Sequence, residues 1–260
     1  MKILTTATEV AVVDDEFEVD GDRIDERYLS HELNEWDEYA IEEAVQVGEA
    51  HEDAEVVVAS IGPERAEEVI RQALAKGADR AIRVWDEALA ERPVLDTETK
   101  ARVLAAIAEE VAPDLVLTGV QTGDHAWGAT GVALARELGY QWAAVVSDLE
   151  LDGEVARVHR ELEGGVEEVV EVDLPAVLTI QSGINEPRYA SLRGIRQAQS
   201  KPLDVRSLSD LGVDVGDGRL SLREMYEPEA EGDTEYVEGS PEEQAARLVE
   251  IFEDAGVIDA

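Results

Sequence analysis

The sequence predicts an α/β fold: a Rossmann-like domain with a parallel sheet, an antiparallel meander and a C-terminal arm. Between residues 1 and 139, short apolar runs alternate with longer segments of helical periodicity, which is typical of a parallel sheet covered on both faces. Beyond residue 139, alternating runs are separated by Asp152-Gly153 and Gly164-Gly165, which predict hairpin turns. Near the end, Ser240-Pro241-Glu242-Glu243 predicts a capped helix start.

The first part of the chain follows this alternation element by element. Residues 55–60 are apolar and β-branched and predict a buried strand, and Gly62-Pro63 opens a helix that Gly77 closes. Asn34 is a good N-cap for the helix expected at 35–49. In chain order we expect strands at 2–6, 55–60, 81–85 and 114–119, helices at 35–49, 63–76, 98–110 and 130–138, and an acidic excursion at 14–30.

The second part changes its pattern. We expect meander strands at 143–151, 154–162 and 166–173, and a strand at 176–180 that returns to the main sheet. Residues 1–201 then form one α/β domain, and the chain becomes irregular after Pro202. Residues 202–260 are expected to be an extended arm with a terminal helix to about residue 253. The residues alone support two interpretations of that helix equally: it docks on a partner, or it belongs to the core.

The charge balance is extreme. The chain has 61 acidic and 22 basic residues, a formal net charge of −39. A polyanion would be repelled over most of such a surface, so nucleic acid is excluded as a general partner. Because the acids lie within segments of clear apolar periodicity, they are not a disordered tail. We interpret them as a surface adapted to high salt, which screens self-repulsion, and expect a halophilic source.

Several kinds of site have no support in the sequence. There is no cysteine, so a disulfide or a thiolate–metal site is excluded. The four histidines lack metal-ligand spacing, and no nucleophile triad or carboxylate pair is visible, so we expect no metal and no catalytic residues. No leader and no apolar run of bilayer length is visible, and the expectation is a soluble, cytoplasmic protein.

A glycine-rich loop at 119–131, GVQTGDHAWGATG, lies between an expected strand and an expected helix. Glycines let the backbone approach a ligand, and a helix start offers free N–H groups and the positive end of its dipole. A phosphate would find donors in the Thr130 hydroxyl and in the amides of Gly128, Ala129, Thr130 and Gly131. The loop is neither a Walker A motif nor the dinucleotide GxGxxG. A phosphate site and a loop without a ligand are equally supported by these residues.

The second segment of interest is 185–201, NEPRYASLRGIRQAQSK, which follows the strand at 176–180. It contains the stiff Pro187 and gathers four cations in a chain short of them, namely Arg188, Arg193, Arg196 and Lys201. Loops placed by a rigid scaffold often carry binding residues. Composition alone favours a simpler interpretation, a solvated helix start after a sheet edge.

The run NEPRYA-S-L at 185–192, preceded by LPAVLTI at 174–180 and EGGVEEV at 163–169, resembles the signature region of the beta subunit of electron-transfer flavoproteins. The resemblance implies an adenine-nucleotide-binding type of α/β domain. It also implies that residues 185–201 are a recognition loop for partner dehydrogenases, formed by Pro187, Arg188, Tyr189 and Leu192. Leu192 would be its exposed anchor, and neighbouring arginines would steer acidic partner surfaces.

The resemblance further implies a nucleotide site. In the loop, Gly119, Gln121, Asp124, Thr130 and Gly131 keep the family pattern, while Val120, His125, Ala126 and Trp127 depart from it. Thr6, Asn34, Ser60 and Gly62 resemble contacts to the adenosine part; a strand-end threonine and a simple N-cap are the alternatives for Thr6 and Asn34. Trp36 stands where the family has an aromatic near the flavin of the other subunit, and core packing is its alternative.

The function implied is that of an electron carrier subunit, not a self-sufficient enzyme. An alpha subunit would hold the redox FAD in a heterodimer, accept electrons from dehydrogenases of the acyl-CoA dehydrogenase type, and pass them to a membrane-bound quinone oxidoreductase. This chain would bind AMP, or a second FAD if the protein is electron-bifurcating. Residues 124–127 do not match the Asp-Gly-Asp-Thr pattern common in the bifurcating branch, which favours AMP. The remaining alternative is a stand-alone ATP- or AMP-binding protein of the stress type.

Overall fold

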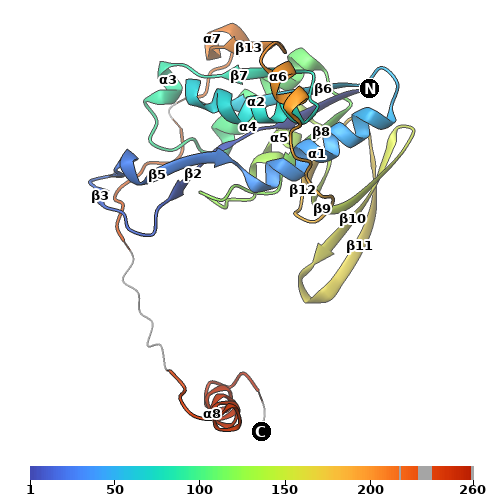
Figure 1. Cartoon of the computed structure of the whole chain (residues 1–260). Helices are drawn as coiled ribbons and strands as arrows, with labels where there is room; N and C mark the ends of the chain where they lie inside the picture. The colour runs from blue at the N-terminus through green and yellow to red at the C-terminus, as the bar shows by residue number, and fades with distance from the viewer. Residues whose placement is uncertain (217, 228–235, 259–260) are drawn as a thin grey trace. The chain divides into compact units, whose positions relative to one another are not determined.

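A computed structural model describes residues 1–216, 218–227 and 236–258. The chain forms two compact units, Met1–Met225 and Tyr226–Ala260, and each is described by itself. Unit 1 is built on a nine-stranded sheet in the order β11-β10-β9-β12-β8-β1-β6-β7-β13 (Figure 1). Within this sheet, all neighbouring strands in the part β9-β12-β8-β1-β6-β7-β13 pair in parallel. β10 pairs antiparallel with both β9 and β11. The predicted fold class, a Rossmann-like α/β arrangement with an antiparallel meander, is confirmed.

The elements of unit 1 are close to those expected as far as β12. The strands of the main sheet are β1 (Lys2–Thr6), β6 (Glu55–Ile61), β7 (Arg80–Val84), β8 (Leu115–Gly119), β9 (Gln141–Asp152), β10 (Val155–Leu162), β11 (Val166–Asp173), β12 (Ala176–Ile180) and β13 (Leu203–Arg206). The helices are α1 (Glu35–Ala50), α2 (Glu67–Lys76), α3 (Glu87–Ala90), α4 (Thr97–Val111), α5 (Thr130–Leu138), α6 (Leu192–Ala198) and α7 (Leu208–Leu211).

The central strands are apolar throughout because both faces of the sheet are covered. In β1, Ile3 belongs to a core with α1 and α2, and Leu4 belongs to a core with α4 and α5. The same alternation recurs in β12, where Leu178 joins the first core and Val177 the second. Strands buried on both sides in this way read as continuous hydrophobic runs, which is why they were visible in the sequence.

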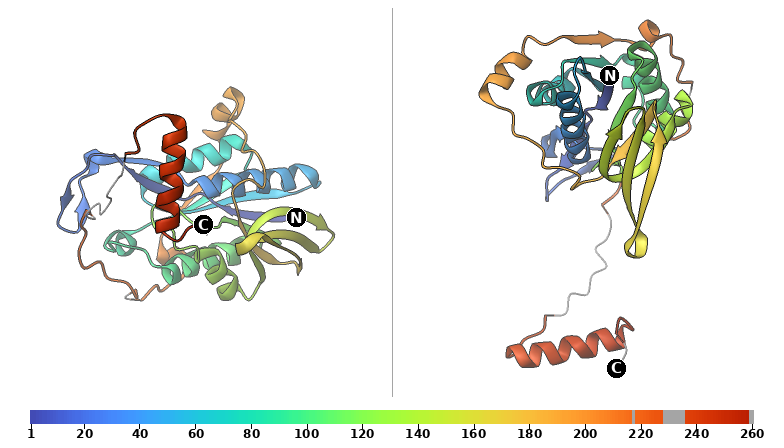
Figure 2. Two further views of the ribbon diagram at one scale, coloured as in Figure 1. Left: turned by 90° about the horizontal axis from the view of Figure 1, so that it is seen from below. Right: turned by 90° about the vertical axis from the view of Figure 1, so that its right-hand side faces the viewer.

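The meander extends the sheet on one side. β9 pairs in parallel with β12 through its first half and antiparallel with β10 through its second half. The change occurs around Val145, which has a positive φ of 62° and interrupts the register on the β12 side. The β10–β11 hairpin projects from the body of unit 1, as the right-hand view of Figure 2 shows. Glycine at 153 and 164 supplies the left-handed backbone of the two turns.

Two stretches contain strands that the sequence analysis did not predict. Residues 9–33 contain the antiparallel pair β2 (Glu9–Val13) and β5 (Leu29–Leu33) and the short pair β3 (Val19–Asp20) and β4 (Arg23–Ile24). The expectation of irregular chain after Pro202 was also wrong, because β13 pairs with β7 at the sheet edge and α7 follows it. β13 has only four residues, two of them charged, so its pattern was too short to recognise.

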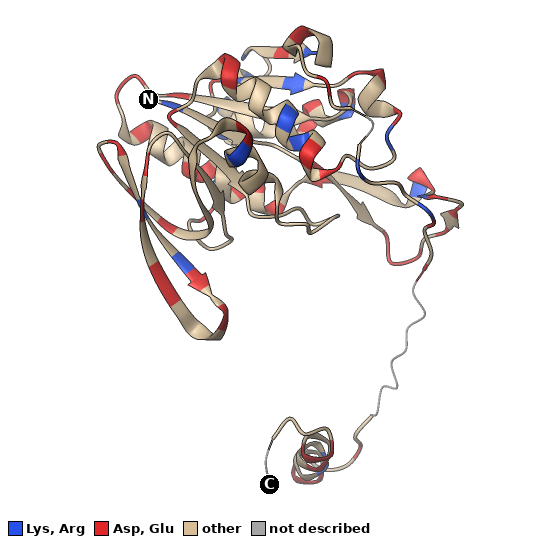
Figure 3. Cartoon of the chain, turned by 180° about the vertical axis from the view of Figure 1, so that it is seen from behind, with Lys and Arg blue, Asp and Glu red and all other residues tan. Residues whose placement is uncertain are grey.

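Unit 2 contains the helix α8 (Pro241–Asp254). Its predicted capping box is present: Ser240 accepts a bond from the Glu243 amide, and Glu243 accepts one from the Ser240 amide. None of the residues of α8 is buried, and the side chains of Leu248, Val249 and Phe252 are exposed. Among the described residues, no helix is long and apolar enough to span a membrane. Figure 3 shows acidic residues on most elements of both units.

Candidate functional site

A cavity lies at the carboxyl ends of β1, β6 and β8, the edge at which open parallel sheets bind ligands. Its empty volume, open solvent included, is ≈ 680 Å³. The glycine-rich loop between β8 and α5 forms one wall, and the first half of α4 contributes another. Seven residues predicted to bind a nucleotide line it, namely Thr6, Ser60, Gly119, Gln121, Gly128, Ala129 and Thr130. Four do not line it, namely Asn34, Gly62, Asp124 and Gly131.

Asp37 links α1 to the ends of β1 and β8 at this cavity. Its carboxylate accepts hydrogen bonds from Thr6 Oγ1 (2.8 Å), the Thr8 amide (2.7 Å) and the Gly119 amide (2.9 Å). The residue is 2% exposed and lies in the first turn of α1, where a carboxylate also interacts well with the helix dipole. The ends of β1 and β8 are therefore fixed by one side chain that the sequence analysis missed. Its only sequence signal was an acid in the first turn of an expected helix.

Asn34 occupies the N-cap position of α1 without capping it through its side chain. Its Nδ2 donates to the Gln121 carbonyl (2.9 Å), and its Oδ1 accepts from the Gly123 amide (3.3 Å). Because Asn34 is fully buried, both bonds act within the protein and hold the first half of the glycine-rich loop against α1. The residue type predicted a cap for Asn34, and the family resemblance implied a nucleotide contact; here Asn34 supports the loop that lines the cavity.

The glycines of the loop serve different purposes. A Cβ on Gly119 would lie 2.8 Å from Asp37 Oδ1 and 2.8 Å from Trp36 Cβ, so a side chain has no room where α1 crosses β8. A Cβ on Gly131 would lie 2.5 Å from Thr179 Cγ2, so this glycine lets α5 pack closely on the sheet. Gly128 has a φ of 60°, and a Cβ there would meet only the Val120 carbonyl oxygen, at 3.8 Å, so its backbone is accessible to a ligand.

Asp124 and His125 contact each other within the loop. His125 Nδ1 lies 2.9 Å from Asp124 Oδ2, and the His125 amide donates to Asp124 Oδ1 at 2.7 Å. Burial pushes the pKa of Asp124 up, but hydrogen bonds from His125 and Thr122 outweigh it and hold the pKa at about 2. The His125 ring in turn contacts the Trp127 ring, with centroids 4.9 Å apart. His125 and Trp127 both line the cavity, although the sequence analysis treated them only as departures from the family pattern.

One polar group of a cavity-lining residue, the Ser60 hydroxyl, has no partner among the described residues. This hydroxyl is buried, in a residue 2% exposed. Buried hydroxyls are almost always bonded, so an unpaired one on a cavity wall is an available contact for a ligand. Trp36 is half-buried beside this region and donates from Nε1 to Gln181 Oε1 at 3.1 Å.

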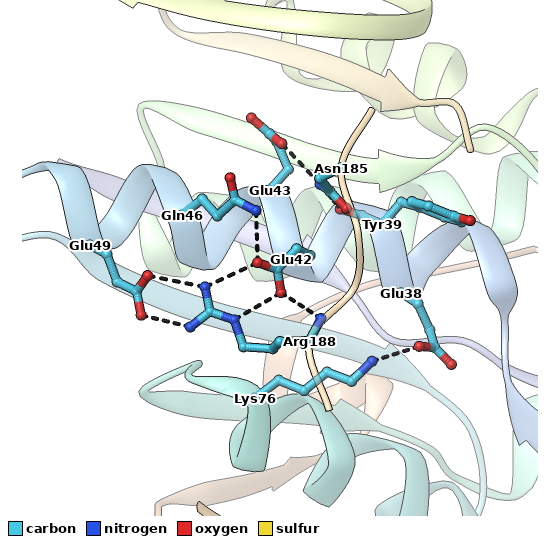
Figure 4. A network of polar contacts seen from close by, with 9 residues as sticks. All are labelled: Glu38, Tyr39, Glu42, Glu43, Gln46, Glu49, Lys76, Asn185 and Arg188. Carbon is cyan, nitrogen blue, oxygen red and sulfur yellow. Dashed lines mark hydrogen bonds and ion pairs between the residues drawn. The ribbon is translucent and has the colours of Figure 1, made fainter. Parts of the chain in front are cut away.

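The second candidate site is the segment between β12 and α6. Arg188 is bound to α1 by its whole guanidinium: Nε and Nη2 donate to Glu42 at 2.9 and 3.0 Å, and Nη1 and Nη2 donate to Glu49 at 2.7 and 3.0 Å. Asn185 donates to Glu43 Oε2 (3.0 Å) and to the Tyr39 carbonyl (3.1 Å). Figure 4 shows these contacts between the loop and one face of α1.

The network accounts for the charge states of its members. Burial pushes the pKa of Glu42 up, but hydrogen bonds from Arg188 and Gln46 leave it below its ordinary value. Burial raises the pKa of Glu43 more than its bond from Asn185 lowers it. The bonds to Glu49 and Glu42 raise the pKa of Arg188. Arg188 is thus neutralised within the chain, and it does not present the free charge expected of the arginines in this segment.

The anchored segment leads directly to exposed apolar side chains. Tyr189 is 98% exposed and Leu192, the first residue of α6, is 77% exposed. The side chain of Ser191 caps α6 by accepting a bond from the Gly194 amide at 3.0 Å. Arg193 and Arg196 are exposed, whereas Lys201 donates to the carbonyls of Leu74 and Ala78 and is part of the fold. The predicted residues of this loop are therefore adjacent, but they divide into an anchor and an exposed face.

Fold and cavity together define a Rossmann-like α/β domain with a pocket at the carboxyl ends of its strands. The family model described as electron transfer flavoprotein domain matches residues 23–211. The chain is 45% identical over 264 residues to the electron transfer flavoprotein subunit beta of Methylophilus methylotrophus, covering 98% of both chains. It is also similar to the beta subunits of Bos taurus (39% over 223 residues, 86% of both chains) and Bacillus subtilis (36% over 222 residues, 85% of both chains). The chain belongs to the electron transfer flavoprotein family, which confirms the resemblance seen at residues 185–192.

Proposed function

We propose that this chain is the beta subunit of a heterodimeric electron carrier whose alpha subunit holds FAD. The heterodimer accepts electrons from dehydrogenases of the acyl-CoA dehydrogenase type and passes them to a membrane-bound quinone oxidoreductase. The observation that carries the proposal is the 45% identity to a beta subunit over 98% of both chains. In this arrangement the half-buried Trp36 lies near the partner's flavin.

The cavity at the carboxyl ends of the strands is proposed to bind AMP. Support comes from the unpaired Ser60 hydroxyl and from residues 128–130, which line the cavity at the start of α5, where a helix offers amide donors to a phosphate. A nucleotide bound only by the folded chain stabilises it by mass action. AMP is favoured over a second FAD because residues 124–127 lack the acidic pattern of the bifurcating branch.

The segment 185–192 is proposed to recognise the dehydrogenases. Leu192 is a small apolar anchor at the start of a capped helix, with the exposed Tyr189 beside it. An apolar anchor on a rigid support binds specifically at little cost in ordering. Arg193 and Arg196 supply the positive charge that steers acidic partner surfaces, since Arg188 is already paired.

The C-terminal part is proposed to be an arm that docks on the alpha subunit, with residues 1–201 as the nucleotide-binding domain. Support comes from α8, which buries no residue within this chain and exposes Leu248, Val249 and Phe252. An amphipathic helix needs a surface that covers such a face.

Co-expression with the large subunit tests the proposal. We expect a yellow heterodimer that is reduced by an acyl-CoA dehydrogenase and its substrate. A colourless homodimer that binds ATP or AMP and never associates with a flavoprotein would contradict it and favour the stand-alone nucleotide-binding alternative.

A further inference from the structure

Lys100 differs from the other lysines of this chain. The chain has four, and the ammonium of each of the other three has an oxygen acceptor: Lys2 donates to the Val111 carbonyl, Lys76 to Glu38, and Lys201 to backbone carbonyls. Lys100 Nζ has no hydrogen bond and no ion pair among the described residues, although the chain carries 61 acids. An ammonium group has three donors, so a partly buried one without any acceptor is an open binding position.

The position of Lys100 is set by two features of the cavity. It lies in the first half of α4 and lines the cavity. Among the described residues that line the cavity, it is the one lysine or arginine. Its Nζ lies 5.5 Å from the centroid of the Trp127 ring, a distance at which a cation is attracted to the ring face. Trp127 belongs to the glycine-rich loop, so this contact brings the ammonium on α4 close to that loop.

The acids near Lys100 have other partners. Asp37 accepts from Thr6, Thr8 and Gly119, and Asp124 is bound by His125. Burial lowers the pKa of Lys100, and the charges of Asp124 and Asp37 only partly oppose this. An anion entering the cavity would supply the acceptor that these acids do not.

Further donors in the same cavity point to a phosphate. Gly128, Ala129 and Thr130 line it at the start of α5, which has no side-chain cap and no acid in its first turn, so its N-terminus can accept an anion. The Ser60 hydroxyl is buried on the wall without a partner. The cavity thus combines one cation, the uncapped start of α5 and an unpaired hydroxyl, which together suit a phosphorylated nucleoside.

We propose that Lys100 binds the phosphate of the nucleotide in this cavity and sets its preference for a nucleoside monophosphate over the nucleoside. This inference rests on the proposed function in one respect, that the cavity binds an adenine nucleotide. Lys100 acts as a point charge with three donors, and Trp127 keeps it at the cavity wall while no ligand is bound.

Binding of AMP and of adenosine to the nucleotide-free full-length chain, in the complex in which it purifies, tests this role by titration calorimetry. Replacing a charged hydrogen-bond partner predicts that Lys100→Met binds AMP about 10- to 100-fold more weakly. Its affinity for adenosine should change less than about 3-fold, because adenosine has no phosphate for Lys100 to bind. Lys100→Arg keeps the charge and should retain most of the AMP affinity, and Lys2→Met removes a charge outside the cavity and should bind as the wild type.

Each contrary result is decisive. Equal AMP affinity in Lys100→Met and the wild type, or an equal loss for AMP and adenosine, overturns the role of Lys100 and leaves the nucleotide site intact. A wild-type chain that binds neither compound overturns the nucleotide site itself. Retained adenosine binding shows that the variant is folded. If Lys100→Met binds neither ligand, the same comparison of AMP affinity with adenosine affinity is made with Lys100→Gln.

Discussion

Arg188→Met tests whether the loop that carries Leu192 is held by the ion pairs with α1. The change keeps a side chain of similar length and removes four hydrogen bonds, two to Glu42 and two to Glu49. Glu42 keeps only the bonds from Gln46 Nε2 (2.7 Å) and from the Arg188 amide (3.1 Å). A carboxylate side chain that is 4% exposed would then lack its cation.

The magnitude follows from the exposure of the three groups. Removing one partner of a fully buried ion pair costs about 3–5 kcal/mol. The Arg188 side chain is 32% exposed and Glu49 is 61% exposed, so water screens the outer half of the network. The Glu49 bonds should therefore contribute little and the Glu42 bonds most, giving a loss of about 1.5–3 kcal/mol in the free energy of unfolding.

Urea unfolding of the two proteins measures this loss, and limited proteolysis shows whether residues 185–192 become more accessible. Arg193→Met is a matched control, because Arg193 is exposed in the same segment and has no ion pair with any described residue; its cost should stay below about 0.5 kcal/mol. A loss as small for Arg188→Met as for the control, with unchanged proteolysis, would refute the view that this clamp positions the loop.

Four further results are expected. Leu192→Ala should leave folding and nucleotide binding intact but slow reduction by acyl-CoA dehydrogenases, and unchanged stopped-flow rates would remove the leucine from recognition. Gly131→Ala should lower the free energy of unfolding by about 1–3 kcal/mol, since its Cβ would meet Thr179 Cγ2 at 2.5 Å; an unchanged melting temperature would contradict that packing. The pKa of Asp124 is depressed from 3.8 to about 2, so its stabilisation of about 1–2 kcal/mol is present above pH 4 and lost as the pH falls towards 2. The difference in the free energy of unfolding between the wild type and Asp124→Asn should disappear between pH 4 and about pH 2. A difference that does not depend on pH would argue against this contribution of the Asp124 carboxylate. Raising NaCl should increase the free energy of unfolding, because screening relieves self-repulsion at a net charge of −39; a decrease would exclude adaptation to high salt.

The sequence was most informative where burial imposes a strong pattern. The run Glu55–Ile61 was recognisable because six of its residues are apolar or small and both faces of the sheet are covered. The capping box at Ser240 was equally direct, because three residues of local sequence define it. The short strand β13 and the four strands within residues 9–33 lacked such patterns and were missed.

The candidate sites divide in the same way. The glycine-rich loop and Leu192 could be located because local motifs carry them. Asp37 and Lys100 could not, since an acid in a first turn and a lysine beside Glu98 in a helix both resemble solvated residues. The pairing of Arg188 with Glu42 joins positions 146 residues apart, and only the tertiary fold brings those charges together.

The nucleotide content of the purified complex tests the central claim most directly. Denaturing the complex of this chain with its flavin-bearing partner and separating the released compounds by chromatography should yield FAD and AMP at one each per heterodimer. Two FAD per heterodimer would place the protein with the bifurcating carriers. A chain that purifies without flavin partner and releases no adenine compound would contradict the account.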